Sequence, residues 1–196
     1  MRAILPLSAA ALALSLAACN SNSNDTATPA ATEEASADAM PADAGASDAV
    51  MADSGMASTP QGFADTMAAS DMFEIESSKL AQSMGKSAAV KSFAAMMVKD
   101  HTKSSAELKA AAGKASPAVT VKPEMTAGQR AELDALKNAG DNFDTLYAQK
   151  QVAGHEKALA ALQGYAANGA DAALKDFASK TAPVVEGHLG QAKKLP

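Results

Sequence analysis

Apolar residues recur at three- and four-residue intervals through most of residues 61–196, and glycine or proline interrupts this pattern at only a few points. Residues three or four apart lie on one face of an α-helix, so each uninterrupted stretch predicts an amphipathic helix. Alanine, leucine, lysine and methionine favour helices and are common here, whereas long β-branched runs are absent. The sequence therefore predicts an all-α domain.

The breaks in the pattern predict four long helices, which we expect at residues 62–84, 88–112, 142–167 and 171–194. A shorter helix is expected at 126–138, where Thr126 and Gln129 have the spacing of a capping box. Tight turns near Gly85 and Gly169 make each flanking pair of long helices an antiparallel hairpin. The longer link between the hairpins leaves room for a ferritin-type crossover without requiring one. We expect a ferritin-like four-helix bundle with a short extra helix between the second and third long helices.

Ionisable residues fall on the face of each long helix that we expect to be buried. The four are Glu74, His101, His155 and His188, one from each helix, and they include all three histidines of the chain. A buried carboxylate is unfavourable unless it is paired, hydrogen-bonded or bound to a metal ion. One such residue would be ordinary, but four on four helices predict a shared polar site in the core of the bundle.

This polar site has two interpretations. Three imidazoles and one carboxylate can bind a single transition-metal ion such as zinc, iron, manganese or copper, with Asp100, Asp144 and Gln151 as candidates to orient the imidazoles. Alternatively, a buried network of hydrogen bonds between the glutamate and the histidines would set the register of the helices without any metal. Imidazoles more than about 8 Å apart would exclude shared coordination, because zinc–nitrogen bonds measure about 2.0–2.1 Å.

Residues 1–18 predict a lipoprotein signal peptide. Arg2 supplies a positive start, and residues 3–18 are almost entirely apolar over a length that suits a secretory signal and is too short for a stable transmembrane helix. The segment ends in Leu-Ala-Ala-Cys, which resembles the lipobox of bacterial lipoproteins. Cys19 is the only cysteine, and lipidation gives it a role while excluding an intramolecular disulfide. Because Asn20 rather than aspartate follows, we expect an outer-membrane anchor that faces the periplasm.

Residues 19–60 have the composition of a disordered tether. They contain seven acidic residues, no lysine or arginine and no aromatic residue, so they cannot bury enough apolar surface to fold. From residue 61 onward, 16 lysines and arginines face 15 aspartates and glutamates. This near-neutral balance argues against a basic surface for nucleic acid or anionic lipid, so we expect contact with the membrane only through the lipid.

Motifs for nucleophilic, zinc-protease or nucleotide chemistry are missing from the sequence, which has no G-x-S-x-G, H-E-x-x-H, P-loop or dinucleotide fingerprint. We therefore expect a non-catalytic envelope protein that binds an unidentified protein partner or supports stress tolerance. A metal-binding or redox bundle that uses the inward glutamate and histidines is the alternative. A carrier with a small-molecule pocket among the methionines and alanines is a third.

Several short motifs resemble the bacterial family called domain of unknown function 4142. They are Glu74-Ile75-Glu76, Met97-Val98-Lys99-Asp100-His101, Phe143-Asp144-x-x-Tyr147 and Pro183 followed by His188-Leu189. The resemblance covers about residues 61–195 and implies a ferritin-like bundle, commonly exported or lipidated, with no established activity. Di-iron ferritins carry a Glu-x-x-His pair on two helices, whereas valine stands three residues before both His101 and His188. A ferritin-type di-iron site is therefore not expected.

Overall fold

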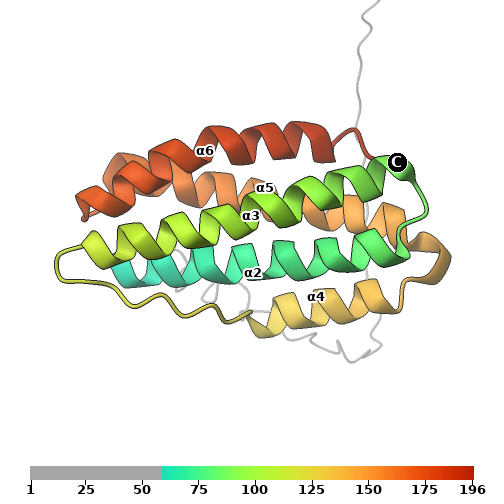
Figure 1. Cartoon of the computed structure of the whole chain (residues 1–196), viewed down its shortest axis with the longest axis horizontal. Helices are drawn as coiled ribbons and strands as arrows, with labels where there is room; N and C mark the ends of the chain where they lie inside the picture. Colours follow the sequence, from blue (N-terminus) through green and yellow to red (C-terminus); the bar gives the residue numbers. More distant parts are fainter. Residues whose placement is uncertain (1–58) are drawn as a thin grey trace, which may run out of the picture. The chain divides into compact units, whose positions relative to one another are not determined.

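A computed structural model describes residues 59–196 (Figure 1), which contain five α-helices, one short 3-10 helix and no strand. The elements are α2 (Pro60–Met84), α3 (Ala88–Lys114), α4 (Ala127–Lys137), η1 (Gly140–Asn142), α5 (Phe143–Asn168) and α6 (Ala172–Ala192). The predicted all-α bundle is confirmed, including the short helix between the second and third long ones. The expected signal peptide, Cys19 and all but the last two residues of the expected tether lie outside the described residues.

Side chains that accept hydrogen bonds from the first turn set the start of several helices. Thr59 caps α2, Ser87 caps α3 and Asp171 caps α6. At α4 the predicted capping box is present, because the Thr126 side chain accepts from the Gln129 N–H and the Gln129 side chain accepts from the Thr126 N–H. These caps satisfy N–H groups that have no partner within the helix, which explains why the local sequence located the helix starts well.

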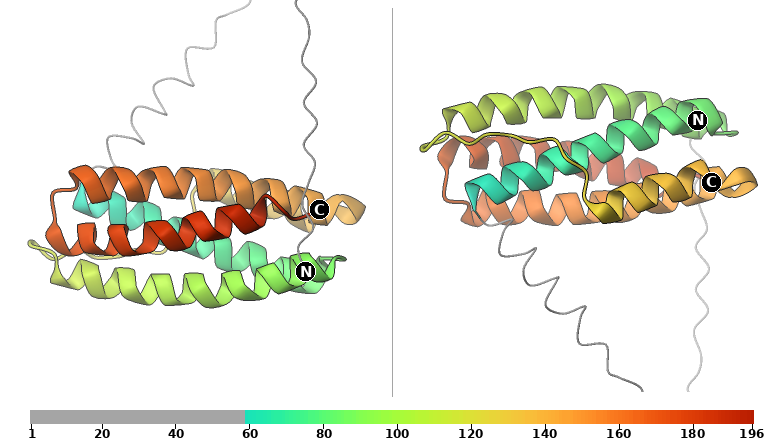
Figure 2. Two further views of the ribbon diagram at one scale, coloured as in Figure 1. Left: turned by 90° about the horizontal axis from the view of Figure 1, so that it is seen from above. Right: turned by 90° about the horizontal axis from the view of Figure 1, so that it is seen from below.

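The connection between the hairpins crosses the length of the bundle. At one end, Asp144 in the first turn of α5 accepts a hydrogen bond of 2.7 Å from the backbone N–H of Ser87, the residue that caps α3. At the other end, the N–H of Ser116 just after α3 donates to Asp171, which caps α6. Helices α3 and α5 therefore start at the same end, so residues 115–142 must return along the bundle (Figures 1 and 2). A single long crossover of this kind is the ferritin topology.

Helix α4 lies within this crossover and packs on the outside of α2 and α5 (Figure 1). Its two buried leucines, Leu133 and Leu136, face inward. Helix α2 is therefore covered by α3, α5 and α4, which explains why both polar and apolar residues are buried along it.

The core is divided into two apolar clusters with polar residues between them along the helices. One cluster gathers around Phe63, Leu108, Leu162 and Leu174. The other is formed mainly by residues nearer the opposite ends of the same helices, including Ala81, Val90, Met97, Phe143 and Ala192. The buried polar residues between these levels, which we call the polar layer, are Asp71, Glu74, Ser77, Ser78, His101, Gln151, His155 and His188. Among residues 59–196, no helix has the length and hydropathy needed to cross a membrane.

Candidate metal centre

Three imidazoles from three helices meet in the polar layer. His101 lies on α3, His155 on α5 and His188 on α6, and each residue is at most 5% exposed. Their ring centroids are 5.6 to 5.7 Å apart, and one nitrogen of each ring lies within 4.8 Å of the corresponding nitrogens of the other two. The three rings are therefore close enough together for shared coordination of one ion.

Hydrogen bonds to the rings determine which nitrogen of each imidazole carries the lone pair. The bonded pairs are His101 Nδ1 with Asp71 Oδ1 at 2.7 Å, His155 Nδ1 with the Gln151 carbonyl oxygen at 2.7 Å, and His188 Nε2 with Asp100 Oδ2 at 3.1 Å. Because carboxylate and carbonyl oxygens accept, the bonded ring nitrogen in each pair donates and the other nitrogen holds the lone pair. Those other nitrogens, Nε2 of His101, Nε2 of His155 and Nδ1 of His188, are buried and have no hydrogen-bond partner within the described part of the chain.

The spacing between the three rings can be compared with that of ligands on one ion. Metal–nitrogen bonds of about 2.0–2.1 Å place three nitrogens around one ion roughly 3.3–3.6 Å from one another. One nitrogen from each ring lies within 4.8 Å of those of the other two, so the rings would have to approach one another by roughly 1 Å to share an ion. The three histidines are therefore a candidate set of three imidazole ligands for one ion.

Asp71 is a central member of the polar layer that the sequence analysis missed. Its two carboxylate oxygens accept hydrogen bonds from His101 at 2.7 Å and from the Ser105 hydroxyl at 3.1 Å. A carboxylate that holds a metal-binding histidine in this way fixes the tautomer and makes the ring a stronger ligand. Asp71 and His101 are separated from the turn at Gly85 by similar lengths of chain, whereas Glu74 is closer to that turn. This count identifies the pairing only once α2 and α3 are known to pack along each other.

Glu74 lies beside the three-nitrogen cluster rather than within it. One of its carboxylate oxygens accepts a hydrogen bond of 2.6 Å from the Gln151 side chain, and the other is 3.7 Å from the bonded Nδ1 of His155. Gly154 leaves the space for this carboxylate, since a Cβ there would be 2.8 Å from Glu74 Oε1. The expected set of three histidines and one glutamate is therefore reduced to three histidines, with Glu74 on the far side of one of them.

The three residues expected to orient imidazoles have different positions. Asp100 accepts from His188, and Gln151 contacts His155 through its backbone carbonyl while its side chain holds Glu74. Asp144 does not reach the site, because it caps the start of α3 at the end of the bundle. Its place in the first turn of α5 puts it close to the turn between α2 and α3, which projection of one helix face does not reveal.

Comparison with known proteins agrees with this architecture. The family model described as a domain of unknown function, DUF4142, matches residues 45–195. The chain belongs to the DUF4142 family. Among solved structures it is similar to CopM in the Cu(I)-bound form, with a TM-score of 0.57 and 18% identity over 69% of this chain and 94% of the CopM chain, a likeness that shows the fold. A search of the curated proteins found no match.

Burial and charge determine the protonation of the histidines in this DUF4142 domain. Burial, together with the neighbouring charge of His101, lowers the pKa of His155 to about 3, and the same two causes lower the pKa of His188. Burial also acts to lower the pKa of His101, but its hydrogen bond to Asp71 and the charge of Glu74 outweigh that effect and raise the pKa. His155 and His188 are therefore neutral at pH 7, which is the form that binds metal.

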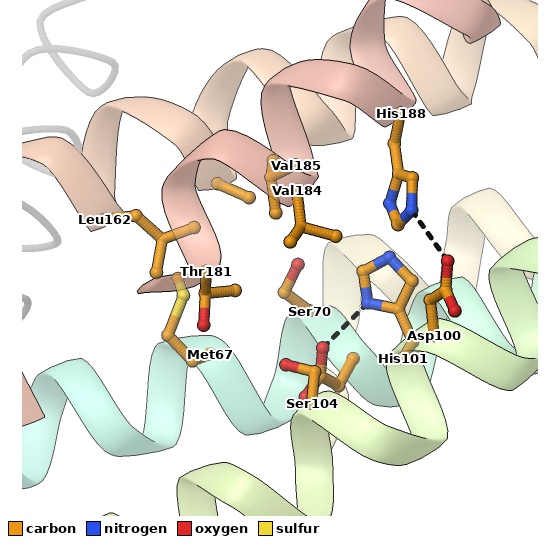
Figure 3. Close-up of a pocket in the computed structure, with 12 residues that line it drawn as sticks. Met67, Ser70, Asp100, His101, Ser104, Leu162, Thr181, Val184, Val185 and His188 are labelled. Carbon is orange, nitrogen blue, oxygen red and sulfur yellow. Dashed lines mark hydrogen bonds and ion pairs between the residues drawn. The ribbon is translucent and has the colours of Figure 1, made fainter. Parts of the chain in front are cut away.

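A small cavity adjoins the cluster in this DUF4142 domain. Its volume is about 30 Å³, and its walls include His101, His188 and the Asp100 carboxylate but not His155. In Figure 3 the two imidazoles lie toward one end of this cavity, and Met67, Leu162 and Thr181 lie toward the other. The cluster therefore has one side packed against protein and one side next to free space.

Proposed function

We propose that this DUF4142 domain binds one copper or zinc ion through His101 Nε2, His155 Nε2 and His188 Nδ1, as a metal-binding protein of the cell envelope. The observation that supports this most strongly is the set of three buried ring nitrogens without hydrogen-bond partners, on rings whose centroids are 5.6 to 5.7 Å apart. Buried polar atoms are nearly always paired, so three unpaired ones at one point need a common partner. A metal ion satisfies all three at once.

A hydrogen-bond network without metal accounts less well for the same geometry. Such a network would use both nitrogens of each ring, but here each ring bonds outward through one nitrogen only. Leaving a buried acceptor unpaired costs roughly 1–3 kcal/mol, so three unpaired nitrogens would be a considerable loss of stability for a purely structural network. The outward bonds instead resemble those that hold imidazole ligands around an ion.

The donor set narrows the choice of metal. Imidazole suits copper, zinc, iron and nickel. The affinity of divalent ions for nitrogen sites generally rises from manganese through iron to copper, and zinc binds less tightly than copper. The site offers three imidazole rings, and the nearby carboxylates of Asp71 and Asp100 are already hydrogen-bonded to histidines. Copper is the first ion to test, since CopM, which shares the fold, was solved in a Cu(I)-bound form.

Metal analysis of the untagged full chain is the direct test. We expect one copper or zinc ion per chain after the protein, purified in mild detergent, is equilibrated with each metal and then passed through a desalting column. His155→Gln, which keeps the size of the side chain nearly constant, is expected to lose stoichiometric binding. Glu76→Gln, at a glutamate on α2 whose side chain is 41% exposed and pairs with Lys79 outside the site, is the control and is expected to keep it.

Two results would contradict the proposal. One is a folded wild-type chain that retains no metal after equilibration with either ion. The other is a folded His155→Gln chain that binds metal as tightly as wild type, which would place the ion elsewhere. Circular dichroism of each preparation separates loss of the site from loss of the fold.

The envelope location rests on residues 1–19 of the sequence. We propose that a diacylglycerol on Cys19 anchors the chain in the outer membrane, with the bundle in the periplasm. Growth with labelled palmitate should label the wild-type chain and leave Cys19→Ser unlabelled, and membrane fractionation should place the label with outer-membrane markers. Equal labelling of the two chains would refute lipidation, whereas label in inner-membrane fractions would refute only the choice of membrane.

A further inference from the structure

The cavity beside the histidine cluster indicates how the bound ion would meet small molecules. We infer that the site keeps a fourth coordination position open, and that this position accepts an exogenous donor no larger than a few atoms, such as water, hydroxide or azide. The inference rests on the proposed function, because it concerns the ion held by the three histidines. It goes further, because it makes the site reactive toward external ligands rather than closed.

The cavity borders two of the three histidines. His101 and His188 line the cavity and His155 does not. The cavity therefore adjoins two of the three rings that would hold the ion. No aspartate, glutamate or further histidine joins the three-nitrogen cluster among residues 59–196, so the protein offers no fourth ligand of these types. Closed structural sites usually have four protein ligands, whereas sites with three keep a position for water or substrate.

The size and lining of the cavity define the class of ligand. A volume of about 30 Å³ exceeds the space that one water molecule needs, roughly 10–15 Å³, and is far below the roughly 300 Å³ of a pocket for an organic molecule. Hydroxyl-bearing residues Ser70, Ser104 and Thr181 are part of its lining, beside the apolar side chains of Leu162 and Val185. Asp71 and Asp100 also line it, so a bound water finds polar partners, whereas a small anion would have to be held by the ion against the charge of these two residues.

The cavity is also close to solvent. Val184, which forms part of its wall, is 48% exposed, and the Asp100 side chain is 30% exposed although it bonds the buried His188. Figure 3 shows Val184 and Asp100 on the α6 and α3 sides of this region. Solvent therefore contacts residues that form the cavity wall between these two helices, and this is the side from which we expect a ligand to enter.

Azide titration of the metal-loaded full chain tests this inference. The chain is loaded with Cu(II), or with Co(II) if zinc is the preferred ion, and azide binding is followed by the charge-transfer absorption band and by electron paramagnetic resonance. We expect saturable binding of one azide per ion, with metal content unchanged afterwards. Ser70→Leu fills the cavity and is expected to weaken azide binding at least tenfold while metal content stays the same.

Ser70→Ala is the matched control, because it removes the same hydroxyl but leaves the space open, and it should bind azide within about threefold of wild type. Thr181→Leu fills the cavity from α6, so the result does not depend on one helix. A metal-loaded wild-type chain whose spectra ignore azide would overturn the inference while leaving the proposed metal site intact. Equal azide affinity in Ser70→Leu and Ser70→Ala would also overturn it. A chain that holds no metal would overturn both proposals, and the metal analysis identifies that case directly.

Discussion

Replacement of Glu74 with glutamine isolates the free energy of burying an ionisable group in the core. Glu74 is 2% exposed, and burial raises its pKa from 4.5 to about 7, against the opposing effects of His101 and of the Gln151 hydrogen bond. Glutamine has nearly the same shape and retains an oxygen that can accept from Gln151. The change therefore removes the titration of this residue while leaving the packing of α2 almost unaltered.

The direction and size of the effect of pH on stability follow from the pKa of Glu74 in the unfolded chain and in the folded chain. The folded chain binds a proton at Glu74 more tightly than the unfolded chain, so stability falls as pH rises from about 4.5 through about 7. A difference of 7 minus 4.5 pKa units, at 1.36 kcal/mol per unit, corresponds to about 3 kcal/mol. Relative to Glu74→Gln, the metal-free wild-type chain should lose about that much stability between pH 4.5 and pH 8. Titration of His155 acts in the opposite direction below pH 6.5, but it is present in both chains and largely cancels in the difference. The Glu74 charge also raises the pKa of His101, so the measured difference includes this coupling between the two residues.

Urea denaturation of the two chains in the presence of a chelator, at intervals between pH 4.5 and pH 8, measures this difference. Glu76→Gln is the control, since its exposed side chain lies on the same helix, and its curve should run parallel to wild type. Parallel curves for Glu74→Gln and wild type would refute the reasoning, because they would mean that folding leaves the pKa of Glu74 unchanged.

Further predictions concern the groups that support the site. Asp71→Asn should weaken metal binding about 10- to 100-fold, measured by competition with a chelator, because the negative partner of an imidazole ligand is lost; unchanged affinity would argue against that role. Gly164→Ala should stabilise the chain by about 0.5–1 kcal/mol, because alanine favours a helix interior more than glycine does and the new Cβ has open space around it. Gly154→Ala on the same helix should destabilise the chain, because its Cβ meets the buried Glu74 carboxylate. Denaturation curves of the two variants should therefore shift in opposite directions, and a shared direction would contradict the clash. Tyr147→Phe should lower the free energy of unfolding by about 1–3 kcal/mol, because the Ser78 hydroxyl that Tyr147 contacts at 2.7 Å is left buried and unpaired. An unchanged denaturation midpoint would show that this hydrogen bond does not contribute to stability.

Much of the fold was predictable because its signals are local. Helix starts depend on capping side chains within three residues, as at Thr126 and Gln129, and helix faces depend on spacing along one helix. The same spacing placed His101, His155 and His188 on inward faces, and all three are buried. These properties need no knowledge of which helix lies next to which.

The partners of the histidines were predicted less well because they depend on how far each helix is displaced along the bundle. Glu74 and Asp71 are one helical turn apart on α2, and only the displacement of α2 against α3 places Asp71, and not Glu74, at the level of His101. The position of Asp144 was predicted wrongly for the same reason. The crossover brings the start of α5 to the start of α3, where Asp144 accepts a hydrogen bond from the backbone of Ser87.

The sequence by itself determined the four amphipathic helices, the short helix between the hairpins and the inward direction of the three histidines, because helical periodicity and capping are short-range properties. Only the tertiary structure decided the crossover, the choice of Asp71 over Glu74 as partner of His101, and the identity of the ring nitrogens left unpaired. Those features depend on the relative rotation and displacement of helices that are far apart in the chain. An individual helix carries no record of either quantity, because both result from packing all of the helices around one core.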